Sequence, residues 1–144
     1  MSPMNLDVGT VLTGNARTIT DAEVALLPAM MGAINALFHD EESAKRSRMG
    51  RRILYGPALL GIAIAGTEHL LHDVVLGLIA ISDVRFRRPV GVGDTVTPTL
   101  TVADRIAKPE KAGDLIQTLD EVHNHEGVLV CEFRRTVMVR RAFA

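Results

Sequence analysis

The segment from Pro57 to Leu71 constrains the fold of this chain more than any other, because it predicts a helix that needs cover on most of its sides. Gly56-Pro57 marks the start, since proline suits the first helical turn, where its missing N–H is no loss. The residues that follow are apolar nearly all round, which is typical of a helix wrapped by a sheet. We therefore expect Gly61 to be enclosed, so that a leucine there would overpack its surroundings.

The second half of the chain has the composition of β-structure. Four candidate strands are separated by turn segments: Leu76 to Arg85, Thr95 to Val102, Leu115 to Val122, and Val128 to Val139. Their spacing indicates an antiparallel meander. Val11 to Ile19 is a possible fifth strand, and the order of one strand, helices and then a run of strands is the α+β pattern. Without an internal repeat or linker, we expect a single domain over residues 1–144.

Another helix is predicted closer to the N-terminus. Thr20-Asp21-Ala22-Glu23 is a capping-box sequence, in which Thr20 and Glu23 each satisfy the backbone N–H of the other. Apolar residues then recur at helical spacing as far as Met31, and the helix is expected to falter at Gly32. The polar segment from Asp40 to Arg52 is expected to lie on the surface.

Composition and charge exclude several classes of function. Sixteen basic and seventeen acidic side chains give a formal net charge of -1, so no overall field attracts nucleic acid or an anionic membrane. The apolar run from Pro57 to Gly66 is about half of the roughly 20 residues needed for a membrane-spanning helix.

Residues Met1 to Thr10 resemble no secretory signal, and the single cysteine, Cys131, is expected to be a buried thiol. We therefore expect a cytoplasmic location.

Five segments together resemble the MaoC-like family of (R)-specific enoyl-CoA hydratases and acyl dehydratases. In chain order they are Arg17 to Glu23, Gly32 to Ala44, Arg52 to Gly61, Arg85 to Thr95, and Glu121 to Arg140. The fourth is the most specific, because the family commonly has Arg-Phe near a strand end, then Pro-Val, a two-residue step and Gly-Asp-Thr. The resemblance covers most of the chain, in one register.

The resemblance implies a hot-dog fold, in which an antiparallel sheet wraps around the long helix at Pro57 to Leu71. It also implies a homodimer or higher oligomer with a continuous sheet, although a heterodimer is possible. Members add water to a trans-2-enoyl thioester or remove it from a 3-hydroxyacyl thioester. They use no metal or redox cofactor, and the acyl group is carried on coenzyme A or on the phosphopantetheine of a carrier protein.

The family's acid and base are an Asp and a His five positions apart. Anchoring the resemblance on Gly32 and on Asp40 gives one register, in which Ala33 stands at the Asp position and Phe38 at the His position. Neither side chain can move a proton. The third requirement of the chemistry, a donor aimed at the thioester oxygen as it gains charge, is kept in Tyr55-Gly56-Pro57, where Gly56 matches the family's oxyanion donor.

Replacement acid and base groups are sought next to the vacated positions. His39 and Asp40 are candidates if the loop shifts by one residue, and Tyr55 is a third. As an alternative, His39 and Asp40 form a solvated surface pair. Asn35 would either orient a substrate water or cap a helix, which is the commoner use of asparagine.

Several basic residues surround the expected thioester tunnel. Arg85 and Arg88, with Arg87, Arg51 and Arg52, would pair with the phosphates of the acyl carrier, since guanidinium groups match phosphate oxygens. Pairing with carboxylates on a solvated face is at least as good an interpretation. Arg134 and Arg135 are adjacent in a strand, so at most one points inward. No metal site is expected, and His69 and His72 fit the last turn of a helix.

Two functions remain open, and a thioesterase ranks below both because Ala58 to Ala65 offers no carboxylate to activate water. The first is an acyl-thioester hydratase or dehydratase with a rebuilt acid/base set. The second is a non-catalytic hot-dog subunit that binds an acyl chain or completes a partner carrying the Asp and His. The loss of both catalytic groups at Ala33 and Phe38 favours the second, and the whole-chain resemblance favours the first.

Overall fold

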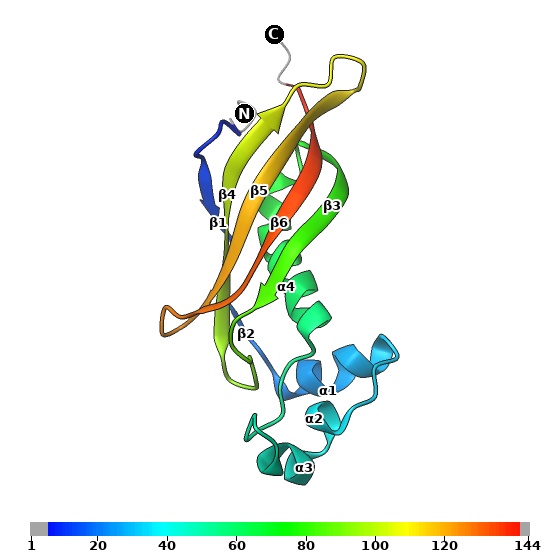
Figure 1. Cartoon of the computed structure of the whole chain (residues 1–144), viewed down its shortest axis with the longest axis vertical. Helices are drawn as coiled ribbons and strands as arrows, with labels where there is room; N and C mark the ends of the chain where they lie inside the picture. The colour runs from blue at the N-terminus through cyan, green and yellow to red at the C-terminus, as the bar shows by residue number, and fades with distance from the viewer. Residues whose placement is uncertain (1–5, 142–144) are drawn as a thin grey trace.

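A computed structural model describes residues 6–141, and it consists of one antiparallel sheet with a long helix against one face (Figure 1). Residues 1–5, part of the segment in which no secretory signal is expected, lie outside the described residues. The strands are β1 Val11–Thr13, β2 Arg17–Thr18, β3 Val75–Phe86, β4 Thr95–Ile106, β5 Gly113–Asn124 and β6 Leu129–Arg140. The helices are α1 Asp21–Met30, α2 Ala36–His39, α3 Glu41–Arg46 and α4 Gly56–Leu71. The α+β expectation is confirmed.

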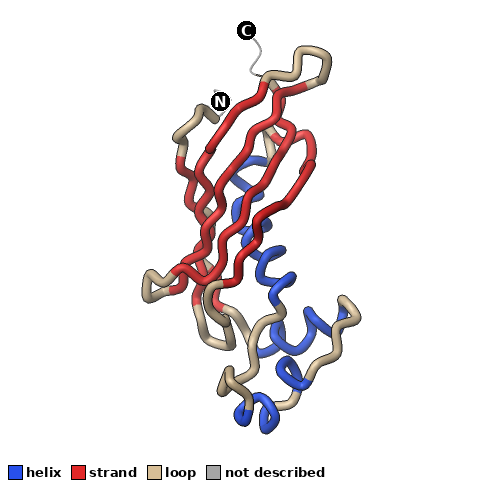
Figure 2. The backbone as a smooth tube through the Cα atoms, in the orientation of Figure 1, coloured by secondary structure: helices blue, strands red, loops and turns tan. Residues whose placement is uncertain are grey.

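The sheet has the order β1-β4-β5-β6-β3, and β2 pairs with β4 next to β1. The last three long strands of the chain form a meander, and β3 is added antiparallel to β6 at the far side. Because β3 ends this order, its second edge is not paired within the described chain. The three short helices gather at the end of the sheet where α4 begins (Figures 1 and 2).

The predicted fifth strand is broken in two at Gly14, between β1 and β2. The Gly14 N–H donates to the Pro98 carbonyl at 2.8 Å, and the Asn15 N–H donates to the carbonyl of Gly66 on α4 at 3.1 Å. A side chain on Gly14 would collide with that same Gly66 carbonyl. The break thus allows the chain to cross directly over α4, and glycine is required for the close approach.

One face of α4 is buried against the sheet. Leu59, Ala63, Thr67 and Leu71 recur every four residues and are all buried, as a helix stripe facing a core must be. Two apolar clusters lie along this stripe, one around Leu59 and Ala63 near the helix start and another around Leu71 near its end. No helix within residues 6–141 combines the length and the apolar character that a bilayer span requires.

The expectation that Gly61 is enclosed is wrong for the single chain. Gly61 is exposed, and a Cβ at this position would meet no atom within 4 Å. Pro57 and Ala65, one turn before and after it, are exposed as well. The sheet therefore covers one side of α4. The apolar residues on the other side of the helix are not explained by packing within residues 6–141.

Gly61→Leu is consequently expected to leave the single chain folded and to raise its stability slightly. Leucine in the middle of a helix is favoured over glycine by about 0.5–1 kcal/mol. Thermal unfolding of the variant, recorded at several protein concentrations, checks this. A large fall in melting temperature that depends on concentration would show that a second chain covers this face.

Other local expectations are confirmed. The capping box starts α1, with the Glu23 N–H donating to Thr20 Oγ1 at 3.2 Å and the Thr20 N–H donating to Glu23 Oε2 at 2.8 Å. Cys131 on β6 is fully buried, and desolvation, with Glu132 nearby, raises the pKa of its thiol to about 11. A thiol with such a pKa remains protonated near neutral pH and is a poor nucleophile.

Candidate functional site

The start of α4 presents a backbone donor in a crowded corner of the fold. Gly56 is the first residue of the helix, so its N–H has no acceptor inside the helix. The ring of Phe86, at the end of β3, lies against Gly56, and a Cβ there would meet ring atoms at 3.1–3.4 Å. Only glycine fits without moving that ring. The partial positive charge of the helix N-terminus adds to the field at this point.

Phe38, which the resemblance places at the family's histidine position, lies close to this donor. Phe38, on α2, is 9% exposed, and its ring meets the ring of Tyr55 edge-on with 5.3 Å between the ring centroids. The Ile53 N–H also donates to the Leu37 carbonyl at 3.2 Å, which ties α2 to the segment that leads into α4. A side chain at position 38 therefore reaches the residue that precedes Gly56.

Ala33 belongs to the turn between α1 and α2. Its N–H donates to the Pro28 carbonyl at 2.8 Å, and the preceding Gly32 has a φ of 82°, which favours glycine. Ala33 is half-buried. Two apolar residues near it are strongly exposed, Ile34 at 85% and Met30 at 80%, so this turn lies at the surface of the single chain.

The other polar candidates of this segment serve as helix caps or face solvent. Asn35 Oδ1 accepts from the Leu37 N–H at 2.9 Å and caps α2. Asp40 Oδ1 accepts from the Ser43 N–H at 2.9 Å and caps α3, and this backbone hydrogen bond lowers the pKa of the Asp40 carboxyl. His39 is exposed. Of the three candidate acid/base groups, Tyr55 alone adjoins Gly56 in the chain.

The arginines divide into two groups. Arg51 forms an ion pair with Asp94 at 2.6 Å, Arg52 binds Asp21 and Glu41, and Arg87 binds Glu132. Arg85 and Arg88, the expected phosphate-binding pair, form no ion pair with a carboxylate of the described residues. Both are exposed, and they donate only to the neighbouring backbone carbonyls of Val84 and Arg87. Within residues 6–141, these two are therefore free to meet an anion from outside.

The turn before β4 is held by Asp94 of the Gly-Asp-Thr motif. Asp94 Oδ2 accepts from the Gly91 N–H at 2.9 Å and pairs with Arg51. Partial burial opposes ionisation of this carboxyl, but the hydrogen bonds from Arg51 and Gly91 outweigh it and lower the Asp94 pKa. The motif thus has a structural role here, fixing the loop that also carries Gly93, with a φ of 88°.

His69 and His72, at the end of α4, make contacts with each other and with the adjacent Asp73. His72 Nδ1 lies 3.0 Å from the His69 carbonyl, and His72 Nε2 lies 3.1 Å from Asp73. Among residues 6–141, no group of three potential ligands is positioned to hold a metal ion.

A buried polar cluster between α4 and the sheet was not anticipated. Arg135 on β6 is 2% exposed, and its Nη2 lies 2.5 Å from Asp120 Oδ2 on β5 and donates to Thr67 Oγ1 on α4 at 3.0 Å. Thr118 Oγ1 donates to Asp120 Oδ1. Burial raises the Asp120 pKa, although the ion pair with Arg135 opposes the shift. The only signal in the sequence was the pair Arg134-Arg135, of which at most one was expected to point inward.

The arrangement of the whole chain defines its class. An antiparallel sheet packed against one long helix is the hot-dog fold, which this chain shares with solved structures. The model of the family described as MaoC like domain matches residues 7–123. This chain therefore belongs to the MaoC-like dehydratase family.

Three comparisons illustrate the relationship. An (R)-specific enoyl-CoA hydratase from Rhodospirillum rubrum is 30% identical over 131 residues, which cover 86% of this chain and 82% of that protein. The structure of a monoamine oxidase regulatory protein from Archaeoglobus fulgidus has a TM-score of 0.89 at 26% identity, covering 98% of this chain and 97% of that one. A chain of the HadBC complex, a 3R-hydroxyacyl-ACP dehydratase from Mycobacterium tuberculosis, has a TM-score of 0.75 at 17% identity, covering 94% and 98%.

Proposed function

We propose that this chain is a hydratase or dehydratase of trans-2-enoyl and 3-hydroxyacyl thioesters, with Gly56 as the donor to the thioester oxygen. The observation that carries the proposal is the corner formed by Gly56, Tyr55 and Phe38 at the start of α4. Gly56 is the first residue of α4, and a backbone donor fixed by a helix stabilises developing charge without reorganisation. Family membership supports the same reaction class.

Tyr55 is the proposed proton-transfer group. Asp40 is engaged in capping α3 and His39 is exposed, whereas Tyr55 immediately precedes the donor Gly56. A phenol hydroxyl is both a donor and an acceptor, so it can deliver its proton to the α-carbon and regain a proton from the water whose oxygen bonds to the β-carbon. The proposed reaction calls for no metal or redox cofactor, and coenzyme A or phosphopantetheine carries the acyl group. Arg85 and Arg88 supply free guanidinium groups for its phosphates.

Tyr55→Phe tests this assignment. The ring that packs against Phe38 is retained and only the hydroxyl is removed, so folding should be preserved. We expect the steady-state rate of trans-2-enoyl-CoA hydration to fall by about 10²–10⁴, the usual contribution of a general acid or base. Binding of the substrate should change little. A purified wild-type chain without turnover on short, medium and branched enoyl-CoA substrates would contradict the hydratase proposal.

A second function is favoured by a specific observation, namely the burial of Phe38 against Tyr55. At the position that the resemblance aligns with the family's histidine, this chain has a hydrophobic contact. Such a chain would suit a subunit that binds the acyl group while a partner supplies the Asp and His. HadBC is a complex, so a dehydratase with this fold can work as an assembly of chains. Turnover that appears only after a catalytic hot-dog subunit is added would select this function.

Either function is proposed to involve a dimer formed at β3. The outer edge of this strand is unpaired within residues 6–141, and the strand carries several exposed apolar side chains: Leu76, Leu78, Ile79, Ile81 and Phe86. Pairing of β3 with the same strand of a second copy would continue the sheet and cover these residues. A homodimer is the default assembly, and a related catalytic chain would use the same edge.

A further inference from the structure

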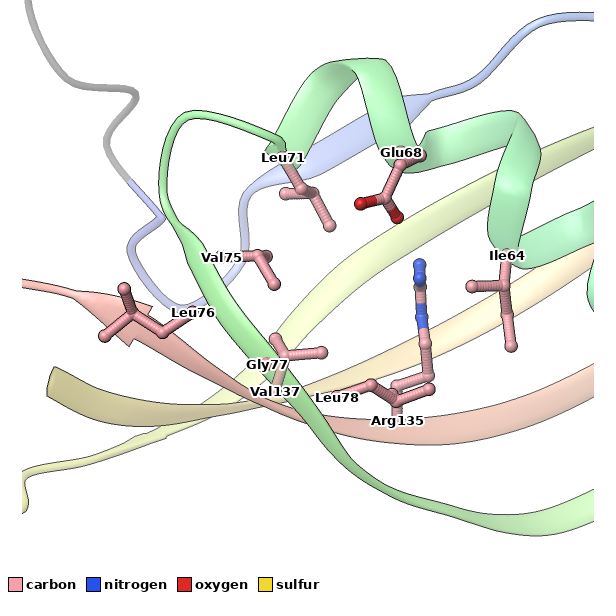
Figure 3. A pocket seen from close by; sticks show the side chains of 9 residues that line it. All are labelled: Ile64, Glu68, Leu71, Val75, Leu76, Gly77, Leu78, Arg135 and Val137. Atoms are coloured by element: carbon pink, nitrogen blue, oxygen red, sulfur yellow. The ribbon is translucent and has the colours of Figure 1, made fainter.

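A cavity of about 320 Å³ lies at the opposite end of α4 from Gly56. Its walls are mostly apolar side chains of α4, β3 and β6: Ile64, Leu71, Val75, Leu76, Leu78 and Val137. Gly77 and two charged residues, Glu68 and Arg135, complete the lining. Figure 3 shows the Glu68 carboxylate and the Arg135 guanidinium directed toward each other across this space.

The cavity and the Gly56 corner lie between the same two elements. At one end of α4, Gly56 contacts Phe86, the last residue of β3, and at the other end the cavity is lined by Leu76 and Leu78 near the start of β3. Glu68 follows Gly56 by twelve positions, so the two are about 18 Å apart along the helix axis. Side chains on a helix lean toward its N-terminus, which brings Glu68 closer to an acyl chain that starts at Gly56.

The arginine at the bottom of the cavity is not fully satisfied. Arg135 is 2% exposed, and its Nη2 is engaged with Asp120 and Thr67, but its Nε has no hydrogen-bond partner within residues 6–141. A buried unpaired donor is costly, so a ligand that brings a hydrogen-bond acceptor to the Arg135 side chain is favoured. On the other side, Glu68 has no partner in the described part of the chain and can only accept hydrogen bonds when ionised.

Charge decides which polar group fits. One cation, Arg135, faces two carboxylates, Asp120 and Glu68, so the site is not an anion pocket. An anionic group on the acyl chain would be repelled by Glu68. An acyl chain with a purely apolar end would displace water from Glu68 and Arg135 without replacing the hydrogen bonds that the water makes. A hydroxyl can donate to Glu68 and at the same time accept from the arginine side.

We propose that the cavity beside Glu68 and Arg135 receives the far end of the acyl group, and that this end carries a hydroxyl. The inference rests on the proposed binding of an acyl thioester at Gly56, and it narrows the substrate class to thioesters of ω-hydroxylated or similarly hydroxylated acyl chains. Glu68 is a specificity-determining residue in this arrangement and takes no part in proton transfer at the thioester.

Three coenzyme A thioesters of equal chain length test the proposal by isothermal titration calorimetry on the full chain: dodecanoyl, ω-hydroxydodecanoyl and the monothioester of dodecanedioic acid. Equilibrium binding is measured, so the result does not depend on turnover. We expect the hydroxylated ligand to bind about two- to tenfold more tightly than dodecanoyl-CoA, the value of one net hydrogen bond. The carboxylated ligand should bind most weakly.

Glu68→Leu should reverse the order of the first two ligands, because it replaces the acceptor by an apolar wall. Glu68 is exposed on α4, so this variant is expected to fold, and Glu126→Leu in the turn between β5 and β6 is the matched control that should keep the wild-type order. Three results would each overturn the inference and leave the proposed function standing. They are equal binding of the dodecanoyl and hydroxylated ligands, tightest binding of the carboxylated ligand, and an unchanged order of affinities in Glu68→Leu. Failure of all three ligands to bind would overturn the proposed function, and the inference with it.

Discussion

The double substitution Ala33→Asp with Phe38→His is expected to create or strongly increase trans-2-enoyl-CoA hydration, by about 10²–10⁴ over the parent chain. The reason is the placement of residue 38 beside Tyr55, one residue before the donor Gly56, so that an imidazole there would lie near the thioester. Acid and base act in one transition state and are strongly non-additive. Each single substitution should therefore remain close to the parent rate.

The measurement is the initial rate of hydration at saturating substrate, with folding followed by circular dichroism. Ala33→Asn with Phe38→Gln is the matched control, because it introduces polar groups at the same positions that cannot exchange protons near neutral pH. Burial is the main risk, since the contact of Phe38 with Tyr55 is lost and an unpaired carboxyl group at position 33 would be driven toward its protonated form. A double variant that is folded and binds acyl-CoA but is inactive would show that the register or the pocket differs from the family's.

The largest effect on stability is expected from Arg135→Leu. This change leaves Asp120 buried without its counter-ion, and breaking one side of a buried ion pair typically costs about 3–5 kcal/mol of unfolding free energy. The loss should be smaller at acid pH. Burial raises the pKa of Asp120, so protonation makes the carboxyl neutral and removes the penalty as the pH falls, whereas ionisation restores it as the pH rises.

Chemical denaturation of further variants separates the causes. Arg135→Leu combined with Asp120→Leu should recover most of the loss, because apolar residues can replace a buried pair with little or no penalty. Arg134→Leu is the matched control on the same strand; the Arg134 side chain is 53% exposed, and its replacement should change stability by no more than about 0.5 kcal/mol. A double variant as unstable as Arg135→Leu would show that the cluster matters through shape and not through charge.

The ion pair between Arg135 and Asp120 contributes to stability and also bears on the proposed substrate specificity. Arg135 is held by Asp120 and Thr67 from two elements, so its guanidinium cannot turn freely toward a ligand. A group fixed in this way presents its remaining N–H donors, on Nε and Nη1, in fixed directions, which favours a ligand whose polar atom can reach one of them. Glu68 lines the same cavity but is exposed and unpaired within the described residues, so its side chain can adjust to a ligand.

Local sequence patterns predicted the elements of this protein, because their causes act within a few residues. The Thr20 capping box, the proline start of α4 and the β-prone segments after residue 75 all correspond to observed elements. The strands are longer than expected at several ends, since pairing with a neighbouring strand extends a segment beyond what its own composition indicates. The candidate oxyanion donor Gly56 was also found at a helix start, as expected.

Tertiary structure alone decided which faces and which partners these elements have. Alternation in β6 predicted that at most one of Arg134 and Arg135 points inward, but the choice of Arg135 depends on register. Arg135 is paired with Thr118, so it is diagonal to Asp120 on the same face of the sheet. Likewise, the composition of α4 suggested enclosure on all sides, whereas the single sheet covers one side and leaves Gly61 open. Both outcomes depend on contacts between residues far apart in the chain, and a sequence carries no local trace of which distant segment will lie opposite.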